Sequence, residues 1–481
     1  MKCHKAKIND KERKHMYRKN AWEHLAEGER AKVMAFAEKY KAYLDAGKTE
    51  RECVTEAVRL AKEAGFTDLN AALCEGRQLK AGDRVYQAWM GKCIMLFIIG
   101  EKDIERGMNI LGAHIDSPRI DIKQNPLYED TGFAYLDTHY YGGIKKYQWV
   151  ASPLALHGVV CLKDGSIVNV NIGENENDPV FYISDLLIHL AGDQMGKTAA
   201  KVVEGEQLNI IIGSEPVKEE DKWTVKANVL KLLKEQYGIE EEDFISAEIE
   251  AVPAGKSRDV GFDRSMIAGY GHDDRVCAYP SMAALLDFEG TPDYTLCAVL
   301  TDKEEIGSVG ATGMGAMYFE NTMAELVANV KGTDSPLALR RCLKNSRMLS
   351  SDVSAGFDPN FAGVFEKKNA SIVGNGVTFN KFTGSRGKSG SNDCNAEFVA
   401  MVRRICDDAG ISWQTAELGA VDVGGGGTIA YICAKYGMNV IDAGLPVLSM
   451  HAPWELISKV DLWEEYKCYC AFIKHAAELE Y

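Results

Sequence analysis

The chain has 481 residues, of which 46% are hydrophobic and 26% charged, and its formal net charge is −15. This acidic balance argues against a nucleic-acid partner or an anionic membrane surface, because both require concentrated positive charge. At roughly 150 residues per unit, the length predicts about three units or a large two-domain protein with an ordinary globular composition.

Two helices and then two strands are predicted in the first part of the chain. The segment GERAKVMAFAEKYKAYLDAG predicts a helix that ends at Gly47. The next segment, TERECVTEAVRLAKEAG, predicts a helix that begins with a capping box formed by Thr49 and Glu52. The apolar runs CIMLFIIG at 93–100 and MNILGAHID at 108–116 predict strands.

A pattern typical of antiparallel sheets follows. In HGVVCLKDGSIVNVNIG, an Asp-Gly turn at 164–165 precedes apolar residues at every second position. We therefore predict that residues 123–261 form a β-rich domain. This domain is inserted into an α/β domain made of residues 1–122 and 262–481.

Strand-like and helix-like runs alternate from about residue 261 onward. YTLCAVLT, ASIVGNGVTF and MNVIDAGLPVL are typical of strands, whereas CNAEFVAMVRRICDDAG and TIAYICAKYG are typical of helices. The alternation predicts an α/β sheet with helices on its faces.

The N-terminal segment and the cysteines indicate in which cellular compartment the protein is expected. Residues 1–20 lack the apolar centre of a signal peptide, and CIMLFII is far too short to cross a bilayer. The 13 cysteines, an odd number, fit reduced thiols better than a disulfide framework. Cys468 and Cys470 stand two apart in a predicted helix and point to different faces, which argues against a shared metal. We expect a cytoplasmic protein without a membrane partner.

Two adjacent glutamates, Glu304 and Glu305, follow the predicted buried strand YTLCAVLT. Neighbouring carboxylates in such a place repel each other and lose solvation, so a cation or a proton must compensate. Open sheets place their sites at the carboxyl ends of strands. The further candidate ligands near predicted strand ends are His114, Asp116, Asp273, Asp274, Asp352 and His451.

Taken singly, each of these residues has an ordinary structural explanation. A strand-end histidine is more often hydrogen-bonded than metal-bound, and an Asp-Asp pair before a helix is usually a cap. The whole set has the imidazoles and carboxylates that a pair of zinc-like ions needs. Residues two apart on a strand share a face. Asp116 is therefore predicted to accept a hydrogen bond from the ring nitrogen of His114 that does not bind metal. Of the glutamate pair, one can bind metal while the other acts as general base.

These residues lie in motifs that resemble the aspartyl aminopeptidase family of metallopeptidases. The motifs, in order, are GAHIDSPR, GHDDRV, TDKEEIGSVGATGM, SSDVSAGFDPN, GKSGSNDCNAEF, DVGGGGTIA and LSMHAPWE. The resemblance covers most of the chain and implies a zinc-peptidase-like catalytic domain with a mixed sheet. It also implies a metalloaminopeptidase that removes the N-terminal residue from peptides with a free amino terminus.

The resemblance further implies two Zn²⁺ ions per subunit, with Co²⁺ or Mn²⁺ as alternatives at one position. His114 and Asp352 would bind one ion, and Glu305 and His451 the other. Asp273 would bridge the two ions.

Other roles implied by the resemblance lie outside this ligand set. Glu304 would be the general base, and Asp116 the carboxylate behind His114. Asp274 stands where the family motif varies and receives no metal. The β-rich insert would serve dimerisation, and dimers would assemble into a tetrahedral dodecamer. An insert histidine, matched here by His189 in SDLLIHLAG, would reach the active site of the neighbouring subunit.

Rival motifs are weak or absent in this sequence. GSRGKSG ends like a phosphate-binding loop, but the pattern needs glycine where Phe382 stands. Neither G-x-S-x-G nor H-E-x-x-H occurs in the chain. The resemblance suggests instead that the glycine run at 425–427 approaches the peptide substrate.

Several alternatives remain open from the sequence. A two-metal hydrolase could act on the carboxyl end of a peptide or on an acylated amino acid, and a metal-bearing assembly protein would cleave nothing. The preferred N-terminal residue is also open. Lys381, Arg386 and Lys388 would suit an acidic side chain, yet the family includes members that prefer neutral residues.

Overall fold

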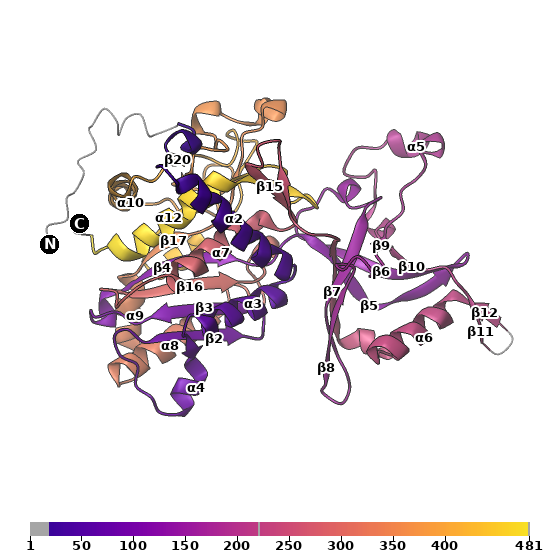
Figure 1. Cartoon of the computed structure of the whole chain (residues 1–481), viewed down its shortest axis with the longest axis horizontal. Helices are drawn as coiled ribbons and strands as arrows, with labels where there is room; N and C mark the ends of the chain where they lie inside the picture. Colours follow the sequence, from indigo (N-terminus) through magenta and orange to yellow (C-terminus); the bar gives the residue numbers. More distant parts are fainter. Residues whose placement is uncertain (1–18, 220–221, 480–481) are drawn as a thin grey trace.

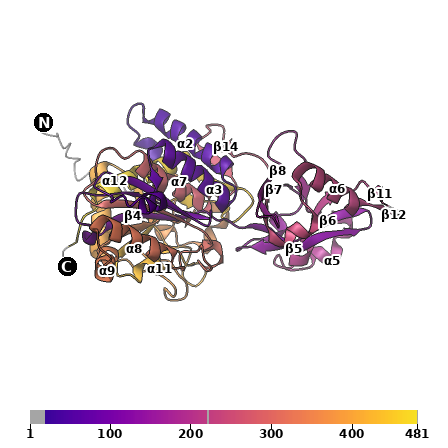
Figure 2. The same ribbon diagram turned by 90° about the horizontal axis from the view of Figure 1, so that it is seen from below.

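The computed structural model describes residues 19–219 and 222–479. Figure 1 shows a larger lobe, which holds a helix-flanked sheet and both ends of the described chain, beside a smaller β-rich lobe. The same two lobes are distinct in the perpendicular view of Figure 2. Most of the N-terminal segment without signal-peptide character, residues 1–18, lies outside the described part. Among the described residues, no helix is long and apolar enough to span a membrane.

A nine-stranded sheet forms the middle of the larger lobe, in the order β1-β2-β3-β16-β4-β17-β21-β19-β20. β4 pairs in parallel with β16 and β17, whereas β3 runs antiparallel to β16, which confirms the expected mixed sheet. Because β4, β16 and β17 are parallel, their carboxyl ends meet at one edge. The strands are β1 (Thr67–Asp68), β2 (Arg84–Trp89), β3 (Cys93–Ile98), β4 (Met108–His114), β16 (Thr295–Thr301), β17 (Arg347–Ser350), β19 (Val377–Asn380), β20 (Trp413–Thr415) and β21 (Asn439–Gly444).

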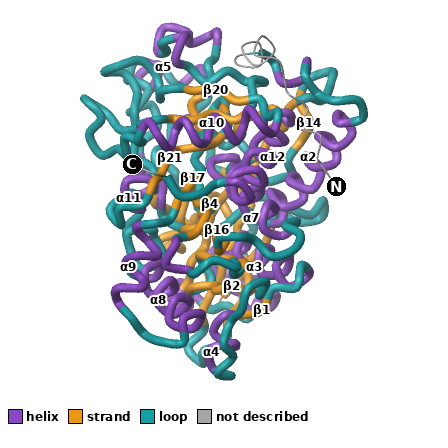
Figure 3. The backbone as a smooth tube through the Cα atoms, turned by 90° about the vertical axis from the view of Figure 1, so that its left-hand side faces the viewer, coloured by secondary structure: helices purple, strands orange, loops and turns teal. Residues whose placement is uncertain are grey.

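Helices cover both faces of this sheet, as Figure 3 shows. One face packs against α2 (Glu29–Ala46), α3 (Glu50–Glu63), α7 (His272–Leu286), α10 (Ala396–Ala409) and α12 (Lys459–His475). The other packs against α4 (Leu69–Cys74), α8 (Tyr318–Lys331), α9 (Pro336–Lys344) and α11 (Ala430–Ala434). Along β4, Leu111 faces the first core and Ile110 the second. Burial on both sides, worth about 1.5–3 kcal/mol for each large side chain, explains why these strands read as continuous apolar runs.

Two local predictions from the sequence, a helix start and a strand, can be compared with the structure. The predicted capping box is present at the start of α3, where the Thr49 hydroxyl and the Glu52 backbone N–H lie 3.2 Å apart. The apolar run at 370–379 is a strand only from Val377 onward. Gly374 and Gly376 have φ values of 91° and 83°, so the chain turns where the run predicted an extended segment.

The smaller lobe contains a seven-stranded sheet in the order β13-β5-β6-β10-β9-β7-β8. β13 also pairs with β7, so the sheet closes on itself. β7 and β8 form a hairpin around the predicted Asp-Gly turn. The strands are β5 (Arg119–Asp130), β6 (Phe133–Tyr141), β7 (Pro153–Cys161), β8 (Ile167–Ile172), β9 (Phe181–Tyr182), β10 (Ile210–Gly213) and β13 (Ala247–Pro253).

Short elements complete both lobes. α5 (Gly192–Met195), α6 (Val225–Tyr237), β11 (Val217–Glu219) and β12 (Lys222–Thr224) belong to the smaller lobe. The remaining strands are β14 (Arg258–Val260), β15 (Met266–Gly269), β18 (Ser354–Ala355), β22 (Pro446–Val447) and β23 (Glu455–Ser458). β14 and β15 pair with each other, and β15 with β23, beside α7. The domain boundaries at 123 and 261 stay a prediction.

Candidate metal centre

The carboxyl ends of β4, β16 and β17 gather several candidate ligands. His114 is the last residue of β4 and is in register with Thr301, the last residue of β16. Glu304 and Glu305 begin the 3₁₀ helix η7 (Glu304–Ile306), which follows β16. Asp352 follows β17 in the same way. Parallel pairing therefore explains how residues far apart in the chain meet at one edge.

Asp273, at the start of α7, lies between two imidazoles. Its Oδ1 is 3.2 Å from Nε2 of His114, and its Oδ2 is 3.2 Å from Nε2 of His451. The same His451 nitrogen is 3.5 Å from Oε2 of Glu305. Each carboxylate oxygen of Asp273 thus faces one imidazole, so this side chain can reach two cations at once.

The described part of the chain contains three groups whose ligand atoms lie within 4.8 Å of one another. They are His114 with Glu304 and Asp352, His114 with Asp273 and Glu305, and Asp273 with Asp274 and Asp352. Imidazole nitrogens and carboxylate oxygens are ligands that Zn²⁺ accepts. All five ligands expected from the sequence therefore lie in or beside one cluster.

Asp274, to which the sequence assigned no metal, also lies in this cluster. Its Oδ2 accepts a hydrogen bond from the backbone of His114 at 3.2 Å, whereas its Oδ1 is buried without a hydrogen-bond partner. Burial raises the pKa of Asp274 well above its usual range.

Asp116 holds several parts of the cluster in place. Nδ1 of His114 lies 3.0 Å from the backbone oxygen of Asp116 and 3.2 Å from Oδ1 of Asp116. The backbone N–H groups of Glu304 and Glu305 donate to the two carboxylate oxygens at 3.1 and 3.2 Å. Tyr141 donates its hydroxyl to Oδ2 at 2.8 Å. Asp116 therefore stands behind His114, as the spacing predicted, and also anchors the glutamate pair.

Glu455, in β23, is a supporting residue that sequence reasoning missed. Its two carboxylate oxygens accept hydrogen bonds from the backbone N–H groups of His451, at 2.6 Å, and Asp273, at 2.9 Å. Burial raises the pKa of Glu455 to about 8. The only signal was its place at the end of LSMHAPWE, four residues after the histidine.

The cluster has more negative charge than its neighbours neutralise. Burial raises the pKa of Glu304 to about 7. Burial, and then the charge of Asp273, raise the pKa of Glu305 well above its usual range. Burial, and then the charge of Glu304, raise the pKa of Asp352 well above its usual range. Glu305 Oε1 is also buried without a hydrogen-bond partner. A divalent cation would supply the missing positive charge, so these residues fit a metal.

The histidines lead to the same conclusion. Burial lowers the pKa of His451, but its contact with Asp273 outweighs this and raises the value to about 10. For His114, burial is likewise outweighed by hydrogen bonds with Asp116 and Asp273, so its pKa is raised well above normal. A proton shared between imidazole and carboxylate occupies the position that suits a metal ion.

A cavity of about 670 Å³ opens beside the cluster. Its wall includes the glycine run 424–427 as well as Glu304, Glu305, Asp352 and His451. A chain segment of peptide size can therefore approach the carboxylates.

The basic loop at 381–388 lies next to the larger cavity, whose lining includes Thr383. Lys381 and Lys388 form ion pairs with Asp393 at 3.3 and 2.9 Å. Arg386 and Lys388 line an adjoining hollow of about 290 Å³, which shares several lining residues with the larger cavity. None of the three cations is among the described residues that line the larger cavity.

His189 lies in the 3₁₀ helix η4 (Ile188–Leu190) next to α5, on the smaller lobe. It is exposed and is not among the described residues that line the cavity of its own chain. Cys468 and Cys470 are outside the three ligand groups found in the described residues, and Cys468 Sγ lies 3.7 Å from Cys406 Sγ.

Comparison with known proteins identifies the relatives of this chain. The model of the aminopeptidase I zinc metalloprotease (M18) family matches residues 43–473. A probable M18 family aminopeptidase 1 from Clostridium acetobutylicum is 56% identical over 458 residues, which are 95% of this chain and 98% of that protein.

Two solved structures extend the comparison. An M18 family aminopeptidase from Thermotoga maritima matches with a TM-score of 0.91 at 43% identity, over 95% of this chain and 99% of that one. The yeast mApe1 dodecamer structure is more distant, with a TM-score of 0.73 at 20% identity over 92% and 96% of the two chains. The family model and the Clostridium relative confirm the resemblance carried by the motifs: this chain belongs to the aminopeptidase I zinc metalloprotease (M18) family.

Proposed function

We propose that this protein removes the N-terminal residue of peptides by a mechanism that uses two zinc ions and a glutamate general base. The observation that carries this proposal is the position of Asp273, whose two carboxylate oxygens each lie 3.2 Å from the Nε2 of a different histidine. A carboxylate placed between two imidazoles in this way could bridge two metal ions, and paired metal ions are a common device of hydrolases.

In this proposal His114 and Asp352 hold one ion, Glu305 and His451 hold the other, and Asp273 bridges them. When bound, the two ions polarise the scissile carbonyl and lower the pKa of the attacking water. The unpartnered Oε1 of Glu305 and the raised pKa values of Glu305 and Asp352 support these roles.

Glu304 is the general base in this mechanism. It lines the cavity, and Asp116 fixes its backbone N–H, so its carboxylate is held next to the bound peptide. It takes a proton from the attacking water and returns it to the leaving amine. Its nearness to His114 and Asp352 also suits a ligand, so the two roles need a direct test.

We also propose that residues 123–261 form a dimerisation domain through which His189 reaches the cavity of a neighbouring chain, in dimers that build a dodecamer. The segment around His189 exposes unusually many apolar side chains for a solvated surface. They are Leu186, Leu187, Ile188, Leu190 and Met195, which are 49–71% exposed. The yeast relative, whose structure is a dodecamer, supports such an assembly.

The decisive experiment compares reporter peptides with free and acetylated amino termini, using protein stripped of metal and reloaded with Zn²⁺, Co²⁺ or Mn²⁺. We expect turnover of the free peptides alone and two ions per chain by elemental analysis. Equal turnover of acetylated amino acids would indicate an acylase, and release of C-terminal residues a carboxypeptidase. A panel of N-terminal residues would also reveal whether acidic or neutral side chains are preferred.

A further inference from the structure

The end of β6 reaches from the smaller lobe to the metal centre. The three consecutive residues Tyr141–Gly143 each meet a different member of that centre. Tyr141 donates a hydrogen bond to Asp116, Gly142 packs beside Glu305, and the carbonyl of Gly143 faces His451. One short segment of the smaller lobe thus touches residues from three separate parts of the larger lobe.

Tyr141 acts on His114 through Asp116. The tyrosine hydroxyl donates to Asp116 Oδ2 at 2.8 Å, and Oδ1 of the same carboxylate lies 3.2 Å from Nδ1 of His114. The Asp116 side chain is fully buried, so water does not replace a lost donor. A carboxylate held in this way fixes the imidazole ring and leaves Nε2 available to a metal.

Gly143 acts on His451 directly. Its carbonyl oxygen lies 2.9 Å from Nδ1 of His451. Because a carbonyl oxygen only accepts hydrogen bonds, Nδ1 carries a proton, and Nε2 can present its lone pair to a metal.

The two glycines allow this close approach. A Cβ on Gly143 would lie 3.3 Å from Nδ1 of His451, and a Cβ on Gly142 would lie 3.4 Å from Oε2 of Glu305. Gly142 also has a φ of 75°, which favours glycine. The backbone of the segment therefore packs directly against the ligands.

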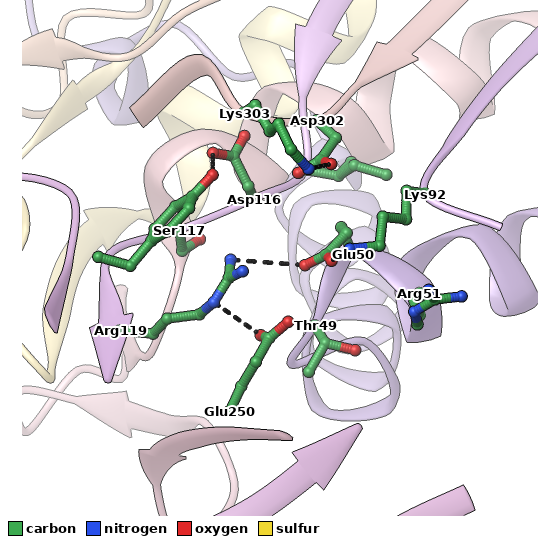
Figure 4. A network of polar contacts seen from close by, with 12 residues as sticks. Thr49, Glu50, Arg51, Lys92, Asp116, Ser117, Arg119, Glu250, Asp302 and Lys303 are labelled. Atoms are coloured by element: carbon green, nitrogen blue, oxygen red, sulfur yellow. Dashed lines mark hydrogen bonds and ion pairs between the residues drawn. The ribbon is translucent and has the colours of Figure 1, made fainter. Parts of the chain in front are cut away.

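Arg119 holds Tyr141 from the other side. Its guanidinium carbon is 3.9 Å from the centre of the tyrosine ring. Its Nε lies 3.2 Å from Glu250 in β13 and its Nη1 lies 3.5 Å from Glu50 in α3. Figure 4 shows Arg119 between these two glutamates, with Asp116 nearby. This buried cation is paired with both lobes and keeps the ring against Asp116.

We propose that the Tyr141–Gly143 segment is a positioning element of the metal centre, by which the smaller lobe orients both metal-binding histidines of its own chain. This inference rests on the proposed two-metal site. It adds a role within one chain to the role of the smaller lobe in assembly.

The first test uses Tyr141→Phe, which removes the hydroxyl but keeps the ring that packs on Arg119. Tyr140→Phe, at the neighbouring residue that is 40% exposed, is the matched control. The Zn²⁺ dissociation constants are measured by chelator competition on the full chain. We expect Tyr141→Phe to weaken binding of one of the two ions about 10–100-fold. The metal-free variant should unfold within about 3 °C of the wild type. Tyr140→Phe should behave as the wild type.

A double-mutant cycle separates positioning from general packing. Because Tyr141 acts through the Asp116 carboxylate, Tyr141→Phe should have little further effect on Zn²⁺ affinity in an Asp116→Asn background. An equal loss of affinity in both backgrounds would overturn the proposed route through Asp116.

The second variant, Gly143→Ala, places a methyl group against His451. It should weaken binding of the Zn²⁺ ion that His451 is proposed to hold. If the wild type binds two Zn²⁺ ions and both variants bind them with unchanged constants, the positioning role is wrong while the proposed function stands. If the wild type fails to bind two ions, the two-metal site itself is wrong, and this inference falls with it.

Discussion

Glu304 and Glu305 share a backbone anchor and one neighbour, His114, but differ in their other neighbours. Both N–H groups donate to Asp116, at 3.1 and 3.2 Å, which fixes the start of η7. Oε2 of Glu305 lies 3.5 Å from His451, and Glu304 is grouped with Asp352. Both glutamates have a carboxylate oxygen within 4.8 Å of a His114 nitrogen. A single anchored turn thus brings two carboxylates into the proposed metal centre.

Substitution of the two glutamates should separate their roles. Glu304→Gln should keep both zinc ions and lose about 10²–10⁴ in kcat, because an amide cannot accept the proton. Glu305→Ala should lose metal as well as activity, because a charged ligand is removed. Elemental analysis beside steady-state kinetics measures both effects. Equal metal loss in the two variants would place Glu304 among the ligands.

Asp273 offers a second prediction at the residue scale. Asp273→Ala should reduce the occupancy of both ions, because each carboxylate oxygen faces one of the two histidines. Zinc content and activity are measured after dialysis against a fixed free Zn²⁺ concentration. If one Zn²⁺ position stayed fully occupied and activity persisted, Asp273 would not be the bridge. The buried Asp274 would then be the next candidate for that role.

At the scale of elements, the contact between α3 and β7 contains a buried histidine. His157 in β7 has its Nδ1 2.8 Å from Glu52 of α3 and its Nε2 3.1 Å from Glu174. Lys48, just before α3, also pairs with Glu174. This cluster joins the larger lobe to the smaller one.

The charge on His157 makes this contact sensitive to pH. Burial lowers the pKa of His157, but hydrogen bonds with Glu174 and Glu52 raise it above the usual 6.5. A histidine whose pKa is raised by folding stabilises the protein fully below about 6.5, and this contribution is lost as pH rises through the folded-state value.

The pH dependence of unfolding should therefore change in His157→Gln, which cannot be charged. As pH rises above about 6.5, we expect the thermal midpoint of the wild type to fall more steeply than that of the variant. His139→Gln, at an exposed position in β6, is the control and should follow the wild type. Superimposable pH profiles for wild type and His157→Gln would contradict the predicted linkage.

At the scale of the whole molecule, the proposed metal centre and His189 occupy different lobes. The candidate ligands lie at the carboxyl ends of β4, β16 and β17, whereas His189 lies in η4, just before α5. Figure 1 shows these strands in the larger lobe and α5 in the smaller one. Its proposed contribution therefore needs a second chain. There it would donate a hydrogen bond to the substrate carbonyl as negative charge develops, a role worth about 3 kcal/mol.

Mixed assembly tests this arrangement. His189→Ala and Glu304→Gln chains should each be nearly inactive alone. When they are co-assembled, part of the activity should return, because the His189→Ala chain supplies an intact base and its partner supplies an intact histidine. Activity of purified mixed dimers, verified by differential tags, measures the recovery. Mixed dimers that stay inactive would remove His189 from the active site and leave the metal ligands untouched.

The sequence by itself determined the features that depend on neighbours along the chain. The capping box of Thr49 and Glu52 and the hairpin around the Asp-Gly turn were predictable because their partners are a few residues apart. The alternation of strands and helices likewise indicated the α/β sheet. Candidate ligands could also be predicted where they follow strands of that sheet, as His114, Glu305 and Asp352 follow β4, β16 and β17.

Only the tertiary structure decided which atoms face each other in the site. The hydrogen bonds between Glu455 and Asp273, between Tyr141 and Asp116, and between Gly143 and His451 join separate segments of the chain. The closure of the smaller sheet through β13 and β7 is also a long-range pairing. No periodicity or local motif encodes such contacts, because they arise only when packing of the two lobes brings these segments together.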